Sequence, residues 1–181
     1  PSKYLLYQDV LLGMFDYHLQ GVDTQSYYSD LAKKLEEALP TVEKYHSLFE
    51  FYHALALVLA DKADLGIRLK KAYDSKNLST MEEISEKVIP RLLENLQTMH
   101  MVREELWMKD AKPFGYELLD IKLGGIATRY LQGNLSHLEE LEQERLPYWE
   151  AEVAYPHPQE LPLRENLWNR IVSGCDLIDT I

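Results

Sequence analysis

The chain has 181 residues, of which 46% are hydrophobic, a length and composition that suit one domain with its own core. A formal charge of −11 and a pI near 5.0 oppose binding to phosphate backbones and anionic lipid, so we expect neither nucleic acid nor a membrane as a partner. The single cysteine, Cys175, excludes an internal disulfide and a thiolate zinc cluster. The longest apolar run, Ala54 to Ala60, is far shorter than the ~20 residues of a membrane-spanning helix.

This composition favours a cytoplasmic protein. The first residue is Pro1 rather than methionine, and the sequence stops at Ile181 without a terminating pattern. We therefore expect the chain to be a piece of a longer protein, with any targeting signals outside it.

Helical periodicity dominates the first half of the chain. Residues 4–19 are apolar on most sides and are expected to form a helix that stops at Gly21. Asp23 or Thr24 is expected to cap a helix that runs to residue 39 and is closed by Pro40. A long helix is predicted from Thr41 to about residue 75, with a core face made of Tyr45, Leu48, Phe49, Tyr52, Leu55, Ala56 and Leu59.

The second half continues the helical pattern and then loses it. A helix starting at Ser79 or Thr80 is expected to reach about residue 109 with a bend at Pro90, and the next is expected to run from Pro113 to about residue 133. Residues 136–145 predict a short acidic helix, and residues 167–172 a closing segment. The fold class is thus an all-α bundle of five or six helices, a single domain over 1–181 with an irregular proline-rich arm at about 147–181.

Two adjacent glycines, Gly124 and Gly125, lie inside the predicted helix that follows Pro113. Each glycine costs a helix interior roughly 1 kcal/mol relative to alanine, so their presence calls for a local reason. Either another backbone packs closely against this segment, or the helix breaks here and presents main-chain groups to a partner.

Metal-ligand spacing occurs on the long helix, where two Glu-x-x-His pairs follow one another one heptad apart: Glu43, His46, Glu50 and His53. Di-iron carboxylate bundles use such pairs, because side chains at i and i+3 share one helix face. Those proteins take the pairs from different helices and turn them inward, whereas a helical wheel turns these four away from the predicted core face. We therefore interpret them as a solvated polar face, with a metal site as the weaker alternative and no cofactor expected.

No catalytic residue is predicted. Ser173, Gly174 and Cys175 lack both the flanking glycines of a nucleophile turn and a neighbouring base. The acidic residues between Glu139 and Glu144 fit a solvated helix face better than a buried general acid.

Three segments suggest a family: KYLLYQDVLLGMFDYHL at the start, KPFGYELLDIKLGG in the centre and LWNRIVSG near the end. Together they resemble the C-terminal helical domain of bacterial glycoside hydrolase family 20, in its exo-β-N-acetylhexosaminidase C branch. The resemblance implies a parent enzyme in which a (β/α)₈ barrel precedes this domain and removes terminal β-linked N-acetylhexosamines with the help of the sugar's own acetamido group. The catalytic His-x-Gly-Gly-Asp-Glu signature of the family is absent from this chain, so the chain alone is expected to be inactive.

The helix with the paired glycines is predicted to be a docking element. Its apolar arc consists of Leu119, Leu123, Ile126, Ala127 and Tyr130. The docking or substrate-proximal candidates are Tyr116, Asp120, Lys122, Gly124, Gly125 and Arg129. An exposed apolar patch is expected either on this helix or around Leu11, Leu12 and Phe15. The expected partner is the barrel of the same chain or a second subunit, and the alternatives are a free-standing interaction module and a metal-binding bundle.

Overall fold

The computed structural model describes residues 2–10, 15–19 and 21–132. Every regular element in these ranges is helical, which confirms the all-α prediction. The acidic helix expected at 136–145, the proline-rich arm and the segment at 167–172 lie outside the described residues.

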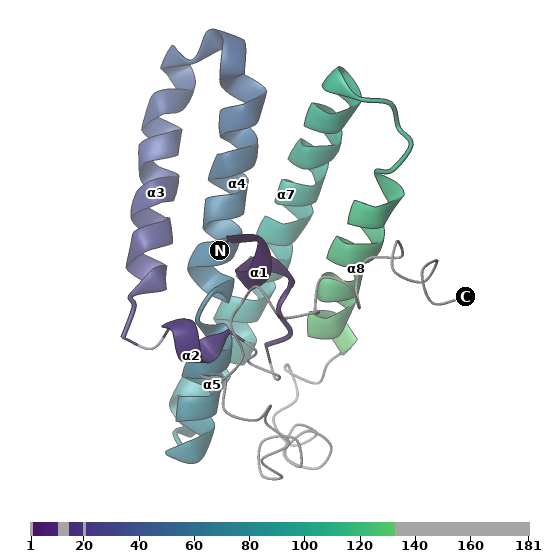
Figure 1. Cartoon of the computed structure of the whole chain (residues 1–181). Helices are drawn as coiled ribbons and strands as arrows, with labels where there is room; N and C mark the ends of the chain where they lie inside the picture. The colour runs from purple at the N-terminus through teal and green to yellow at the C-terminus, as the bar shows by residue number, and fades with distance from the viewer. Residues whose placement is uncertain (1, 11–14, 20, 133–181) are drawn as a thin grey trace, which may run out of the picture.

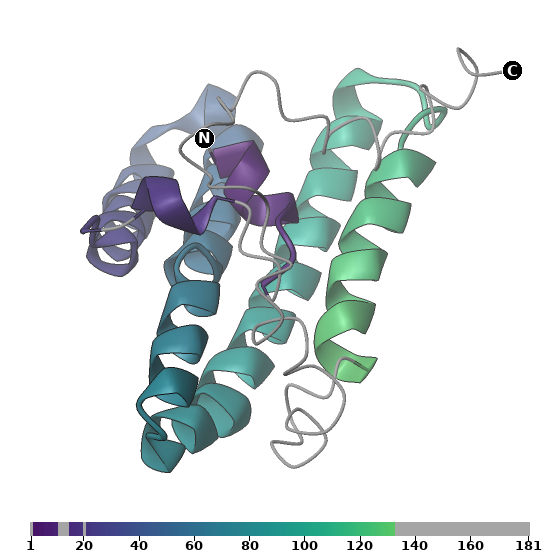
Figure 2. The ribbon, with the colours of Figure 1, turned by 60° about the horizontal axis from the view of Figure 1, so that its bottom comes forward.

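The described elements, in chain order, are α1 (Ser2–Tyr7), α2 (Asp16–Leu19), α3 (Thr24–Ala38), η1 (Leu39–Thr41), η2 (Glu43–Tyr45), α4 (His46–Lys62), α5 (Leu65–Asp74), α6 (Leu78–Glu83), η3 (Ile84–Val88), α7 (Ile89–Asp110) and α8 (Glu117–Gln132). The four long helices pack in sequence, α3 on α4, α4 on α7 and α7 on α8, and so form a row (Figure 1). Helix α1 lies across one side of this row, in contact with both α4 and α8 (Figure 2).

The prediction of one continuous helix over residues 4–19 is wrong, because the segment contains two separate helices, α1 and α2. The Gln8 side chain interrupts the helical pattern: its Oε1 accepts a hydrogen bond from the Phe15 backbone N–H at 3.0 Å. The stop at Gly21 is confirmed, since this residue has φ of 77° just after α2. Such a positive φ is accessible to glycine at little cost.

Helix α3 begins and ends where the sequence predicts. The Asp23 carboxylate accepts a hydrogen bond from the Ser26 backbone N–H at 2.9 Å and thereby caps the helix. The helix ends at Ala38, and Pro40 lies in the 3₁₀ turn η1 that follows. Two short turns then lead the chain into α4, which packs against α3 as a hairpin.

The long helix predicted from Thr41 to about residue 75 is divided into α4 and α5 by a break at Ala63 and Asp64. Its predicted core face is only half buried. Leu59 is 1% exposed and Leu55 is partly buried against the core, whereas Tyr45, Leu48 and Tyr52 are 54%, 36% and 48% exposed. Helical spacing correctly grouped these residues on one face, but it did not show which of them other parts of the chain would bury.

The helix predicted to start at Ser79 or Thr80 begins at Leu78, one or two residues earlier, because the Asn77 side chain caps α6 by accepting a hydrogen bond from the Thr80 N–H at 3.2 Å. A wide π-helical turn, η3, lies directly before α7, in which Pro90 is the second residue, and the bend expected at Pro90 stays a prediction. Proline lacks an N–H and its ring crowds the carbonyl four residues earlier, so a widened turn there relieves both conflicts.

The core is continuous along the row and reaches α1. Leu59, Leu65 and Leu92 are its most completely buried large side chains. The closest backbone approach at a described glycine is at Gly66 in α5: a Cβ placed there would lie 2.5 Å from the Val10 carbonyl oxygen. Only glycine lets the segment after α1 pass so near α5.

Candidate docking surface

Helix α8 runs without a break through Gly124 and Gly125, so of the two explanations for these glycines the break in the helix does not hold. A Cβ added at either glycine would meet no described atom within 4 Å, and both residues are exposed. No backbone of the described residues therefore requires these glycines, and close approach by a partner stays a prediction.

The apolar arc of α8 faces the interior of this domain. Leu123 and Tyr130 are 6% and 2% exposed and belong to the core, and Ile126 packs against it. Helix α8 packs mainly against α7 and α1. The arc is thus already covered, and the free surface of α8 carries Ile121 instead, which is 69% exposed.

Asp120 and Lys122, the charged candidates at the edges of the arc, both have partners within the domain. An Asp120 carboxylate oxygen lies 2.6 Å from Nε2 of His100 on α7. The Lys122 ammonium lies 5.6 Å from the ring centroid of Tyr7 on α1. These contacts tie α8 to α7 and α1, and the side chain of Arg129 lies outside the described residues.

Tyr116 is a buried anchor at the turn before α8. Its hydroxyl donates a hydrogen bond to the His100 carbonyl at 3.1 Å, and its ring stacks on the His100 ring at 5.9 Å and tilts against Trp107 at 5.8 Å. Burial, with a smaller effect from the Asp120 carboxylate, raises the pKa of Tyr116 to about 12. With 3% of its surface exposed, this ring offers no platform for stacking on a sugar within the domain.

Two cations that the sequence did not single out connect the helices. The Arg103 guanidinium lies over the rings of Phe51 and Trp107, 5.1 and 5.3 Å from their centroids, and so joins α4 to α7. Lys62 is 2% exposed, and its ammonium donates to the Gln8 carbonyl at 2.6 Å. Lys62 lies in the charged stretch from Asp61 to Asp64, which gives no sequence signal that its ammonium will be buried.

The burial of Lys62 changes the electrostatics of the α1–α4 contact. Desolvation lowers the pKa of Lys62 to about 8, an effect opposed by the Asp9 and Asp16 carboxylates. Burial likewise raises the pKa of Asp16 to about 6, although the Gln8 amide donates to this carboxylate at 3.0 Å. We therefore expect the contact to be sensitive to pH on both sides of neutrality.

The apolar patch expected around Leu11, Leu12 and Phe15 is not formed by Phe15, which is 2% exposed and packs 5.2 Å from the Tyr4 ring. Leu11 and Leu12 lie outside the described residues. Phe15 is buried because the Gln8 hydrogen bond to its N–H holds the chain against the core.

The four metal-ligand candidates do not converge. His46 Nδ1 lies 3.3 Å from a Glu50 carboxylate oxygen as an i, i+4 pair whose side chains are about half exposed, and neither Glu43 nor His53 joins them. Within residues 2–10, 15–19 and 21–132, no three histidine, cysteine or acidic side chains are grouped so that they could hold a metal ion.

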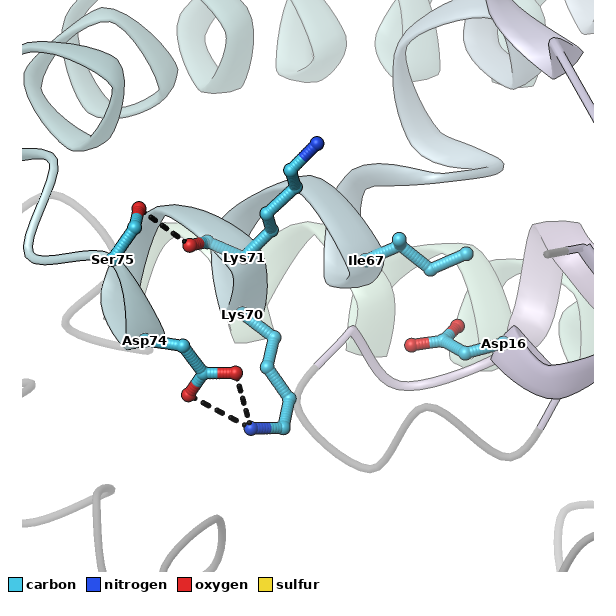
Figure 3. A pocket seen from close by; sticks show the side chains of 6 residues that line it. All are labelled: Asp16, Ile67, Lys70, Lys71, Asp74 and Ser75. Carbon is cyan, nitrogen blue, oxygen red and sulfur yellow. Dashed lines mark hydrogen bonds and ion pairs between the residues drawn. The ribbon is translucent and has the colours of Figure 1, made fainter. Parts of the chain in front are cut away.

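A hollow of about 500 Å³ lies between α2 and α5 (Figure 3). It is lined by Asp16, Ile67, Lys70, Lys71, Asp74 and Ser75. The Lys70 ammonium is held by both carboxylate oxygens of Asp74, at 3.0 and 2.9 Å, and the Ser75 hydroxyl donates to the Lys71 carbonyl at 2.8 Å. These polar groups satisfy one another along one helix and do not converge on a common point, so the hollow has no catalytic arrangement.

In the described part of the chain, no helix combines the length and the apolar character that crossing a membrane requires. No curated protein matches the chain. The family model described as "Glycoside Hydrolase 20C C-terminal domain" matches residues 1–158. The match covers most of the sequence and agrees with the resemblance carried by the opening and central segments. The chain therefore belongs to the family of glycoside hydrolase 20C C-terminal domains.

Proposed function

We propose that this chain is the non-catalytic C-terminal accessory domain of an exo-acting β-N-acetylhexosaminidase. In this proposal it packs on the catalytic barrel of the same chain or on a dimer partner, and it supports removal of terminal β-linked N-acetylhexosamine from glycans. The single observation that carries the proposal is the family match over residues 1–158. The absence of the catalytic His-x-Gly-Gly-Asp-Glu signature from the sequence agrees with an accessory role.

The exposed apolar side chains support a role in docking. Phe114 is 89% exposed, Ile121 is 69% exposed and Tyr27 is 63% exposed. Isolated apolar residues are ordinary on a protein surface, but large aromatic side chains are enriched where proteins meet. The surface thus offers apolar anchors at several places along the row of helices.

The outer surface of α8 is still proposed to contact a partner. Gly124 and Gly125 leave this surface without side chains next to the exposed Ile121, so a partner backbone could approach closely there. Asp120, Lys122 and Arg129 are proposed to lie at the rim of such a contact, where charges set orientation and contribute little net affinity.

The proposal is tested by hydrolysis of a chromogenic β-N-acetylglucosaminide. The chain of 181 residues should release no chromophore, and the longer protein with its catalytic domain should release it. Turnover by the chain alone that survives repurification would refute the accessory role. In the longer protein, charge reversal of Lys122 and Arg129 together should lower activity or dimerisation, and the melting temperature of the same variant of the short chain serves as the control for folding.

A free-standing interaction module without a glycosidase is the alternative. This alternative also explains the exposed apolar surface, but it predicts that the gene encodes no catalytic barrel ahead of residue 1. Reading the gene upstream of residue 1 separates the two. A metal-binding bundle is the weaker alternative, and metal analysis of the purified chain tests it.

A further inference from the structure

One apolar stripe of α4 is covered along only half of its length. Its members follow one another at steps of three and four residues: Leu48, Tyr52, Leu55 and Leu59 lie on α4, and Tyr45 lies at the end of the 3₁₀ turn η2, directly before α4. Leu59 is fully buried and Leu55 partly buried, in the cluster that also contains Leu5 and Leu6 of α1. The other three side chains are exposed. The stripe therefore continues past the edge of α1 as an apolar strip of surface.

In the described part of the chain, helix α1 crosses α4 partway along its length and does not reach the end of α4 next to the α3–α4 connection (Figure 1). A helix rises ~1.5 Å per residue, so Tyr52 is only ~5 Å along the axis from Leu55, and Leu48 ~10 Å. The uncovered strip is thus adjacent to the element through which the chain enters the domain.

We propose that Tyr45, Leu48 and Tyr52 form the seat of the catalytic domain of the same chain. This inference rests on the proposed function, in which the domain is C-terminal and the catalytic part is joined to it through α1. A domain tethered at α1 meets the neighbouring strip of α4 at high effective concentration. Tyrosine suits such a contact, because its ring buries apolar surface while its hydroxyl keeps a hydrogen-bonding partner.

The edges of the strip are polar, as expected for an interface. The Lys44 ammonium lies 5.4 Å from the ring centroid of Tyr45. On the side of α4 that faces α7, the Lys109 ammonium donates to the Ser47 hydroxyl. A catalytic domain that docks on this strip would then offer apolar side chains flanked by acceptor oxygens for Lys44 and Lys109.

Residues 133–181 are a less favoured occupant of the strip. They follow α8, whose end lies near the opposite end of α4: the Tyr130 ring is 5.9 Å from the Lys62 ammonium. Lys62 lies 14 residues after Leu48, or ~21 Å along the helix axis. Helix α1 itself packs on α4, the helix that carries the strip, although its end at Gln8 also lies beside Lys62.

Tyrosine-selective nitration with peptide mass spectrometry tests the seat directly. Tyr27 on α3, which is 63% exposed, is the matched control for Tyr45 and Tyr52, which are 54% and 48% exposed. In the chain of 181 residues, all three should react at similar rates. In the longer protein, Tyr45 and Tyr52 should react about tenfold more slowly, which corresponds to ~1.4 kcal/mol of docking free energy, and Tyr27 should be unchanged.

A double substitution completes the test. Leu48→Asp with Tyr52→Asp in the longer protein should restore the nitration of Tyr45, because the charged strip no longer accepts an apolar partner. Met101→Asp is the control, since Met101 is 57% exposed on α7 and should leave Tyr45 protected. The short chain carrying the double substitution should melt as the unsubstituted chain does, because both replaced side chains are exposed.

Three results would overturn the inference. Rapid nitration of Tyr45 and Tyr52 in an active longer protein would mean that the strip is free surface, and the proposed function would still stand. Protection already present in the short chain and lost on deletion of 133–181 would assign the strip to that segment. Protection that disappears on dilution would assign it to a second copy. Failure of the proposed function is distinct, since it would appear as a longer protein without hydrolytic activity.

Discussion

The two kinds of glycine in this fold should respond oppositely to one added methyl group. Gly66 lies at the start of α5, where a Cβ would meet the Val10 carbonyl oxygen at 2.5 Å and an Asp16 carboxylate oxygen at 3.1 Å. The first neighbour is backbone and cannot rotate away. Forcing atoms into such a packed site costs typically 1–3 kcal/mol, against a gain in helix propensity of at most about 1 kcal/mol. Gly66→Ala should therefore destabilise the chain by about 1–2 kcal/mol.

Gly124→Ala is the matched control, because it adds the same methyl group where no described atom lies within 4 Å. The variant should gain about 0.5–1 kcal/mol, since alanine loses less backbone entropy than glycine in a helix. Urea unfolding followed by circular dichroism gives both free energies of unfolding, with the midpoint concentration as the robust measure. A Gly66→Ala variant as stable as the parent chain, or a Gly124→Ala variant that loses stability, would refute this reasoning.

Two further predictions concern charged side chains. Arg91 donates to both carboxylate oxygens of Asp61, which is 4% exposed, so Arg91→Ala should cost about 1–3 kcal/mol of unfolding free energy by leaving that carboxylate unpaired. Lys70→Ala breaks the exposed pair with Asp74 and should cost at most ~0.5 kcal/mol. Equal losses of stability in urea unfolding would contradict the argument from burial. The raised pKa of Asp16, about 6, means that its contribution to stability is fully present below 3.8 and is lost as the pH rises through 6. Asp16→Asn should therefore become steadily more stable relative to the parent chain between pH 4 and pH 7, and a constant difference across that range would show that the carboxyl titrates normally.

Local signals in the sequence predicted the helix ends well. Asp23 caps α3, Gly21 takes a positive φ after α2 and Pro40 follows the last residues of α3, as expected. Each signal acts within a few residues of itself, because a cap or a stop depends on backbone groups of the same turn. Tertiary structure has little chance to override them.

The errors arose where a distant contact decides the structure. The helix predicted over residues 4–19 is split because Gln8 makes its hydrogen bonds to Phe15 and Asp16, and its carbonyl accepts from Lys62. Helical periodicity along residues 4–19 contains no information about Lys62, which lies 54 residues after Gln8. Glycines pose the same problem. Among the described glycines, Gly66 is the one that close packing requires, whereas the prediction of close approach was made for the adjacent pair Gly124 and Gly125.

Helix α1 is held by cations from two neighbouring helices, and this bears on how the domain could act on its parent. Lys62 of α4 donates to the Gln8 carbonyl at the end of α1, and Lys122 of α8 lies over the ring of Tyr7. The charge of Arg103 on α7 also opposes the rise that burial causes in the pKa of Tyr7. A catalytic domain joined ahead of α1 would therefore be connected to the long helices collectively rather than to one flexible end. If the catalytic domain also docks on the uncovered strip of α4, its attachment at α1 and its contact with the strip together fix its orientation. The row of helices would then hold the catalytic domain rigidly.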